Sequence, residues 1–125
     1  MTKKAQRQCA KTTSSCKSKG RRLQQDVAKA ILLKFPQLRP CDVSSTPMGC
    51  AGADIRLSTA AKSAFPYSVE CKNVERLNVW DAYDQACANS GDYEPLLVMK
   101  KNRKKPLVVM DAESFINLVK KCRIQ

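Results

Sequence analysis

The chain has 125 residues, of which 43% are hydrophobic, and a formal net charge of +12 at pH 7. It suits a single domain, and because it has neither a membrane-length apolar run nor a signal peptide, we expect a cytoplasmic protein without a membrane partner. The lack of histidine removes the commonest general base, and the seven scattered cysteines contain no Cys-x-x-Cys pair, so free thiols are expected rather than zinc or disulfides.

Positive charge is concentrated at the start of the chain. Residues 1–40 carry eleven Lys or Arg and one acid, whereas the remainder carries twelve basic and ten acidic residues. This imbalance favours a polyanion partner, with nucleic acid as the first candidate, over a tail that only aids solubility. Residues 1–18 are polar without apolar periodicity, which predicts a basic disordered arm and leaves 19–125 as the domain.

The first predicted element is a helix over about 21–35, ended by Pro36. Hydrophobic residues recur there at helical spacing, and Gln24 points the same way as Val27 and Ile31. A polar amide on a buried face needs partners, which a buried polar cluster would supply. The alternative is a glutamine at the margin of the stripe.

The following segments alternate between strand and helix patterns. We expect strands at 39–46, 54–57, 67–72, 96–99 and 107–110, a helical turn at 59–64, a helix between Asn78 and Gly91, and a last helix capped by Asp111. This order predicts an α/β fold with a mixed central β-sheet flanked by helices.

Three side chains suggest a site for chemistry. Glu70 and Lys72 share one face of the strand at 67–72, and Asp54 stands at the start of the preceding strand. If these strands pair as a hairpin, the two carboxylates converge and repel each other unless a cation lies between them. A hard divalent cation fits such a place, with the lysine beside it. The alternative is a surface Glu-Lys pair with Asp54 as an ordinary turn acid.

With Asp54 in "GADIRL" and Glu70-Cys71-Lys72 in "YSVECKN", the chain resembles the PD-(D/E)XK nuclease superfamily. It is most similar there to archaeal-type Holliday junction resolvases and small phage-encoded nucleases. The resemblance implies a restriction-endonuclease-like αβββαβ core. It also implies a Mg²⁺-dependent (or Mn²⁺-dependent) DNA endonuclease that acts on branched DNA as a homodimer, in the host cytoplasm if phage-encoded.

The resemblance also assigns roles to residues. Asp54, Glu70 and the Cys71 carbonyl would hold the metal ion, and Lys72 would position the attacking water. The stretch from Lys19 to Gln24 is similar to a resolvase segment that carries a glutamate, so Gln24 would complete the pocket without adding negative charge.

Other basic residues suggest a phosphate track. They lie at the start of the first predicted helix and in a basic hairpin tip: Lys19, Arg21, Arg22, Lys100, Lys101, Arg103, Lys104 and Lys105. Ser45 is either a phosphate contact or a turn residue, and we expect Trp80 in the core rather than stacked on a base.

Two other classes of function stay open on the sequence. Because Gln24 replaces an acid, the chain could be a non-catalytic nucleic-acid-binding protein that retains the nuclease fold. A basic packaging protein unrelated to nucleases would lack the predicted sheet.

Overall fold

The computed structural model describes residues 3–124, with side chains described for 17–123. The elements follow the predicted order of helices and strands. They are α1 (Lys3–Lys34), the short 3₁₀ helix η1 (Pro40–Asp42), β1 (Val43–Ser45), β2 (Ile55–Leu57), α2 (Thr59–Ala64), β3 (Tyr67–Asn73), α3 (Val79–Ala88), β4 (Glu94–Lys100), β5 (Leu107–Val109) and α4 (Ala112–Ile124).

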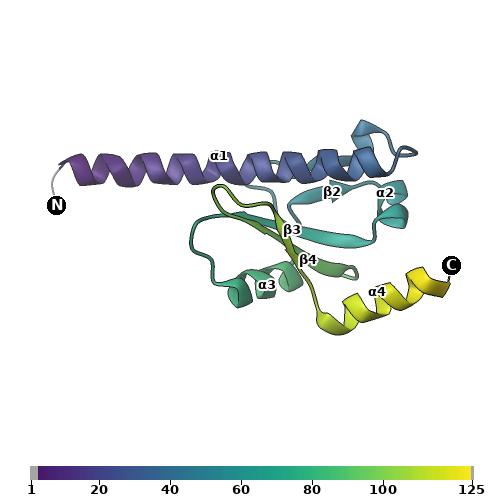
Figure 1. Ribbon diagram of the computed structural model, residues 1–125. Coiled ribbons are helices and arrows are strands. Elements are labelled where there is room, and N and C mark those ends of the chain that lie inside the picture. Colours follow the sequence, from purple (N-terminus) through teal and green to yellow (C-terminus); the bar gives the residue numbers. More distant parts are fainter. Residues whose placement is uncertain (1–2, 125) are drawn as a thin grey trace.

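The architecture is mixed α/β, as predicted. The strands form two small sheets, an antiparallel pair β1-β2 and a mixed sheet in the order β3-β4-β5, in which β3 and β4 run parallel. Helix α3 makes the crossover between the parallel strands. Figure 1 shows α1 along one side of the strands and α3 on the other. The predicted single central sheet is therefore divided in two.

Helix α1 starts much earlier than the sequence suggested. Residues 3–18 were predicted as a disordered arm, but their backbone continues the helix that ends at Lys34. Lys, Gln, Ala and Arg between residues 3 and 11 are good helix formers, and no Gly or Pro interrupts the chain before Gly20. Periodicity failed here because a polar helix has no apolar stripe. The predicted end before Pro36 is confirmed.

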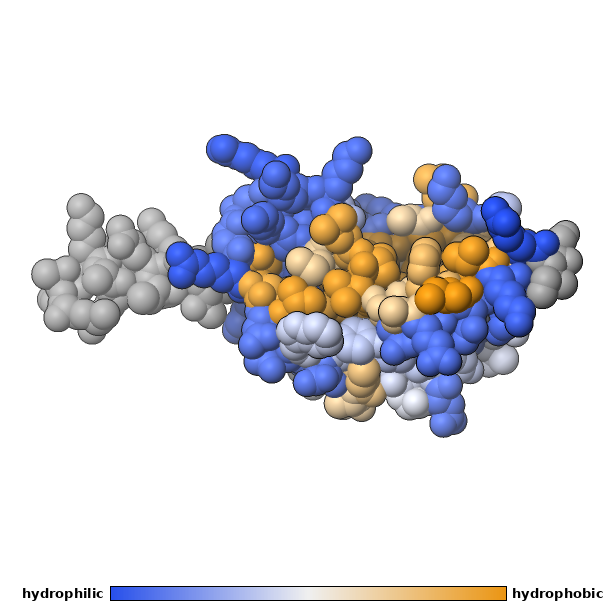
Figure 2. Space-filling model, turned by 60° about the horizontal axis from the view of Figure 1, so that its bottom comes forward, coloured by the Kyte–Doolittle hydropathy of each residue, from blue (hydrophilic) through white to orange (hydrophobic). Residues whose placement is uncertain are grey.

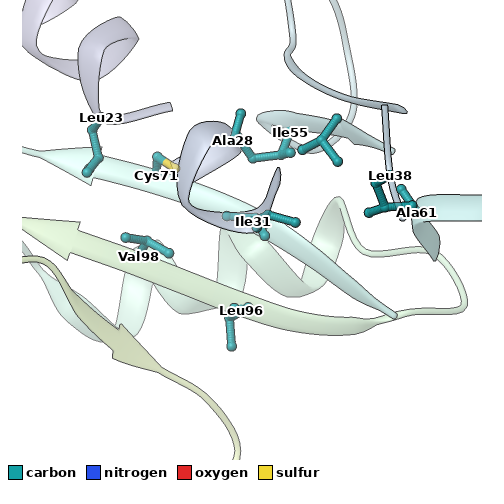
Figure 3. Packing of buried hydrophobic residues seen from close by; sticks show 11 residues of the cluster. Leu23, Ala28, Ile31, Leu38, Ile55, Ala61, Cys71, Leu96 and Val98 are labelled. Atoms are coloured by element: carbon teal, nitrogen blue, oxygen red, sulfur yellow. The ribbon is translucent and has the colours of Figure 1, made fainter. Parts of the chain in front are cut away.

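The main core lies between α1 and the strands (Figure 3). Leu23, Ala28 and Ile31 form the buried face of α1. They pack in one cluster with alternate residues of β3 and β4, namely Val69, Cys71, Leu96 and Val98. Residues that alternate along a strand share a face, so Glu70 lies on the opposite face of β3.

Removing the Leu23 side chain should destabilise the protein far more than the same change on the exposed side of α1. Leu23 is 1% exposed and Leu33 is 78% exposed. We expect Leu23→Ala to lower the free energy of unfolding by about 2–5 kcal/mol, and Leu33→Ala to change it by about 0.5 kcal/mol or less. Urea unfolding followed by circular dichroism measures both. Equal losses in the two variants would contradict the packing of α1.

The later helices begin as their capping residues predicted. The Asn78 side chain accepts a hydrogen bond from the Asp81 N–H at 3.2 Å, and the Asp111 carboxylate accepts one from the Ser114 N–H at 2.9 Å. These bonds satisfy N–H groups that have no partner inside a helix. They fix the residues at which α3 and α4 start.

A hydrophobic surface remains exposed around β5 and α4. Figure 2 shows this apolar area, bordered by hydrophilic residues. Val108, Phe115, Ile116 and Val119 are between 42% and 65% exposed. A groove of about 880 Å³ runs between α4 and the body, lined by residues that include Phe35, Phe65, Tyr67, Leu96, Val108 and Phe115. Apolar areas of this kind usually mark contact sites.

Within residues 3–124, none of the helices combines the length and the hydrophobicity that a membrane crossing requires.

Candidate active site

Asp54 is held in place by three hydrogen bonds. Its N–H donates to the Val69 carbonyl of β3 at 2.9 Å, its carbonyl accepts from the Thr46 N–H at 2.8 Å, and its Oδ2 accepts from the Cys71 N–H at 2.7 Å. The residue therefore bridges the two sheets just before β2. The hairpin pairing assumed from the sequence is reduced to this one point, which suffices to bring Asp54 beside β3.

The loop before Asp54 depends on two glycines. Gly49 has φ 84° and Gly52 has φ 101°, backbone angles that residues with a Cβ rarely adopt. The Thr46 hydroxyl spans the loop by donating to the Ala53 carbonyl at 2.6 Å. The loop returns the chain to β2 with the Asp54 carboxylate directed at β3.

Glu70 is the buried acid of the site, with 4% of its surface exposed. Its Oε1 lies 3.8 Å from the Lys72 Nζ, and its Oε2 accepts a hydrogen bond from the Asn89 Nδ2 at 3.4 Å. Asn89 is the C-cap of α3, and its carbonyl accepts a long bond of 3.4 Å from the Ser68 hydroxyl. Helix α3 thus contributes a residue that orients Glu70.

The two carboxyl groups influence each other. Burial raises the pKa of Asp54, although the hydrogen bond from Cys71 and the charge of Lys72 act against this. Burial is also the largest cause of the raised pKa of Glu70, and the negative charge of Asp54 raises it further. Two acids that both resist ionisation at one place would be relieved by a shared cation.

Cys71 is unsuited to act as a nucleophile. Its side chain lies in the core with Leu23 and Val98, and burial raises the pKa of its thiol. Its backbone is better placed, because the N–H that bonds Asp54 and the carbonyl of an extended residue point to the same side. The Cys71 carbonyl therefore faces the strand edge where Asp54 lies.

The residues present fit a small divalent cation such as Mg²⁺ or Mn²⁺. Among the side chains of residues 17–123 no cluster of three or more His, Cys, Asp or Glu occurs, so the candidate ligands are the carboxylates of Asp54 and Glu70 and the Cys71 carbonyl. Magnesium is commonly bound by one or two carboxylates, with water and phosphate oxygens as its other ligands.

The structure also shows where Gln24 and Trp80 lie. Gln24 is partly buried on α1, and no hydrogen bond joins its amide to Asp54, Glu70 or Lys72 among the described side chains. It belongs to the helix that packs against the Cys71 face of β3, opposite Glu70. The prediction of a buried Trp80 is wrong, because that side chain is 80% exposed.

Two of the predicted phosphate contacts, Lys19 and Lys100, lie at the C-terminal end of β3. The Lys19 carbonyl accepts a hydrogen bond from the Asn73 Nδ2 at 3.3 Å, and Asn73 pairs with Lys100 across β3 and β4. The Arg21 guanidinium lies 2.9 Å from the Met48 sulfur in the loop that leads to Asp54. Helix α1 and the hairpin tip therefore meet the same end of β3.

The remaining predicted contacts are also accessible to solvent. Ser45 pairs with Ile55 at the edge of β1 and is partly buried. The others are exposed, namely Arg22, Lys101, Arg103, Lys104 and Lys105.

Asn89 is the site residue that the sequence did not reveal. It lies nineteen positions from Glu70, and its position before Gly91 suggested only the end of a helix.

Comparisons with family models, with curated proteins and with solved structures returned no match for this chain.

Proposed function

We propose that the protein is a Mg²⁺-dependent endonuclease that hydrolyses phosphodiester bonds of DNA, with a preference for branched DNA. The observation that supports this most is the meeting of Asp54, Glu70 and Lys72 at one place, with Glu70 buried and 3.8 Å from the lysine. Apart from the short helices η1 and α2, the order of elements is a helix, three strands, a helix and a strand parallel to β3, which suits the PD-(D/E)XK superfamily.

Each group has a separate role in this proposal. Asp54, Glu70 and the Cys71 carbonyl would hold the metal ion, and Asn89 keeps Glu70 oriented. When bound, the ion supplies Lewis-acid stabilisation of the phosphate charge. The Lys72 ammonium orients the attacking water and offsets negative charge that develops on the phosphorus oxygens. The water oxygen forms a bond to phosphorus and releases a proton to solvent, while the bond to the leaving oxygen breaks and that oxygen takes up a proton from solvent.

The surface around the site supports a polyanionic substrate. Lys19 and Arg21 on α1 and Lys100 at the start of the hairpin tip lie near the strand that carries Glu70 and Lys72. Lys and Arg gain affinity for DNA by releasing counterions from phosphates. We therefore expect binding that weakens steeply as salt is added.

Incubation with DNA and Mg²⁺ tests the proposed activity. Supercoiled plasmid, linear duplex and four-way junctions are offered to the wild-type protein, with chelator in place of Mg²⁺ as the control. We expect cleavage with Mg²⁺ or Mn²⁺ and none with chelator, with junctions cut fastest. Intact DNA in all three forms at every tested Mg²⁺ concentration would rule the proposal out.

A second candidate is a non-catalytic nucleic-acid-binding protein with the nuclease fold. Gln24 favours it, because it stands where the resolvases that the chain resembles carry an acid, and no hydrogen bond to the carboxylate pair is found among the described side chains. DNA binding that is indifferent to Mg²⁺ and to Asp54→Asn would select this candidate.

The carboxylate pair should also make stability depend on pH and on divalent cations. Raised folded-state pKa values, above the ordinary 3.8 and 4.5, mean that the folded protein binds protons more tightly than the unfolded chain. The contribution of the pair to stability therefore falls as the pH rises from the ordinary pKa values to the raised ones of the folded protein. Above the raised values it remains unfavourable.

Comparison with a variant isolates this contribution from other titrating groups. Between about pH 4 and pH 7, the melting temperature of Glu70→Gln should rise relative to that of the wild type, because glutamine does not ionise. Mg²⁺ at pH 7 should raise the melting temperature of the wild type and not of the variant. Parallel pH curves for the two proteins would refute the coupling.

A further inference from the structure

A second groove lies just beyond the candidate active site. It measures about 410 Å³ and is bounded by the end of β3, the segment before α3 and the hairpin between β4 and β5. Its apolar side chains come from Val74, Leu77, Met99 and Leu107. This volume falls in the range of sites for small organic groups.

The same groove has a strongly positive border. Lys100, Lys101, Lys104 and Lys105 line it, and among the described side chains none of them takes part in an ion pair. One carboxylate is present, that of Glu75, and its Oε1 accepts a hydrogen bond from the Asn102 N–H at 3.2 Å. This bond fixes the hairpin tip against the segment after β3.

We infer that this groove binds an unpaired nucleotide of a DNA strand, with the base against the apolar side chains and the flanking phosphates on the lysines. A phosphate contact alone requires only cations. An apolar floor adds a surface for the flat face of a base, which is available only when the base is not stacked inside a duplex. The inference rests on the proposed function for its ligand, DNA, but not on hydrolysis.

The groove lies close to Lys72, and this position predicts where the substrate has an unpaired nucleotide. Val74 lies two residues after Lys72, and its N–H donates to the Lys100 carbonyl at 3.1 Å. Two residues of extended chain span roughly 7 Å. An unpaired nucleotide held there would lie next to the scissile phosphate, as it does where a duplex ends in a branch or a flap.

Binding to a single strand and to its abasic counterpart tests the inference. A short labelled strand and the same strand with abasic sites at its central positions carry equal phosphate charge and differ only in their bases. Affinities are measured by fluorescence anisotropy with chelator present, so that cleavage plays no part. We expect the wild type to bind the normal strand at least about fivefold more tightly than the abasic one.

Two matched variants test whether the preference for the normal strand over the abasic strand depends on this groove. Leu107→Ser removes apolar surface from the groove, and Val108→Ser changes the next residue of β5, which faces the groove beside α4. Both side chains are more than half exposed, at 61% and 56%, so both variants should fold. We expect Leu107→Ser to bring the ratio of the two affinities close to one, and Val108→Ser to keep it.

Other results would overturn the inference. Equal affinity of the wild type for the normal and abasic strands would reduce the groove to a phosphate contact. Competition by an acidic peptide as strong as that by the normal strand would make it a general anion site. Loss of the preference in Val108→Ser but not in Leu107→Ser would place the base elsewhere. A protein that shows the preference and cuts no DNA would contradict the proposed nuclease activity and leave the inference standing.

Discussion

Glu70→Gln is expected to lower Mg²⁺-dependent DNA cleavage by about a thousandfold or more. Glu70 is 4% exposed and is one of the two carboxylates that would hold the ion. Glutamine has nearly the same size and can still bond with Asn89, so the change removes charge without leaving a cavity. Initial rates of junction or plasmid cleavage measure the effect, and circular dichroism checks the fold.

The matched control for Glu70→Gln is Asp84→Asn, which also converts a carboxylate to an amide but lies exposed on α3. It should cleave at the wild-type rate. Asp54→Asn provides an independent check, because an amide oxygen can still accept the bond from the Cys71 N–H while the negative charge is lost. A Glu70→Gln protein that cuts as fast as the wild type would falsify the assignment of the site.

Lys72→Met is expected to lower the cleavage rate by about a hundredfold to a thousandfold while metal binding survives. Lys72 lies 3.8 Å from the Glu70 carboxylate, where its positive charge repels a divalent cation and attracts a developing phosphate charge. Removing it should therefore leave the affinity for Mn²⁺ unchanged or raise it. Cleavage rates and calorimetric titration with Mn²⁺ separate the two effects.

The control for this variant is Lys120→Met, which removes an exposed lysine of α4. It should have no effect on the cleavage rate beyond a small change in DNA affinity. Loss of Mn²⁺ binding in Lys72→Met would indicate that the lysine maintains the structure of the pocket instead of taking part in the reaction. Full activity in Lys72→Met would exclude Lys72 from the mechanism.

The part of the site that lies on one strand was predictable from the sequence. Glu70 and Lys72 are two residues apart in a clear strand pattern, so their common face follows from strand geometry. Asp54 was predictable as a neighbour because only a short connection separates it from β3. The sequence suggested a ladder of hydrogen bonds between two paired strands. In the structure, three hydrogen bonds of Asp54 itself hold this residue in place.

Contacts made by distant elements could not be predicted in the same way. Asn89 reaches Glu70 only because α3 returns antiparallel to β3 and ends beside it, a result of packing and not of any local pattern. The same holds for Trp80. Its place near the apolar stripe of α3 suggested the core, but the small residues Ala82 and Ala86 are the ones that α3 buries.

Helix α1 shows the limit of periodicity as a guide. Its buried face from Leu23 to Ile31 follows the predicted stripe, whereas the backbone from 3 to 18 is helical without one. Gln24 lies at the border of that stripe. Helix α1 covers the Cys71 face of β3. The position of Gln24 around the helix axis therefore could not show that its amide lies on the face of β3 opposite Glu70.

Crystals soaked in Mn²⁺ and measured at the manganese absorption edge show whether Asp54 and Glu70 share a metal ion. We predict one anomalous peak between the carboxylates of Asp54 and Glu70, within coordination distance of the Cys71 carbonyl and absent from Glu70→Gln crystals treated alike. An ordered lattice with manganese bound elsewhere and nothing between these two carboxylates would exclude a metal site at this pair.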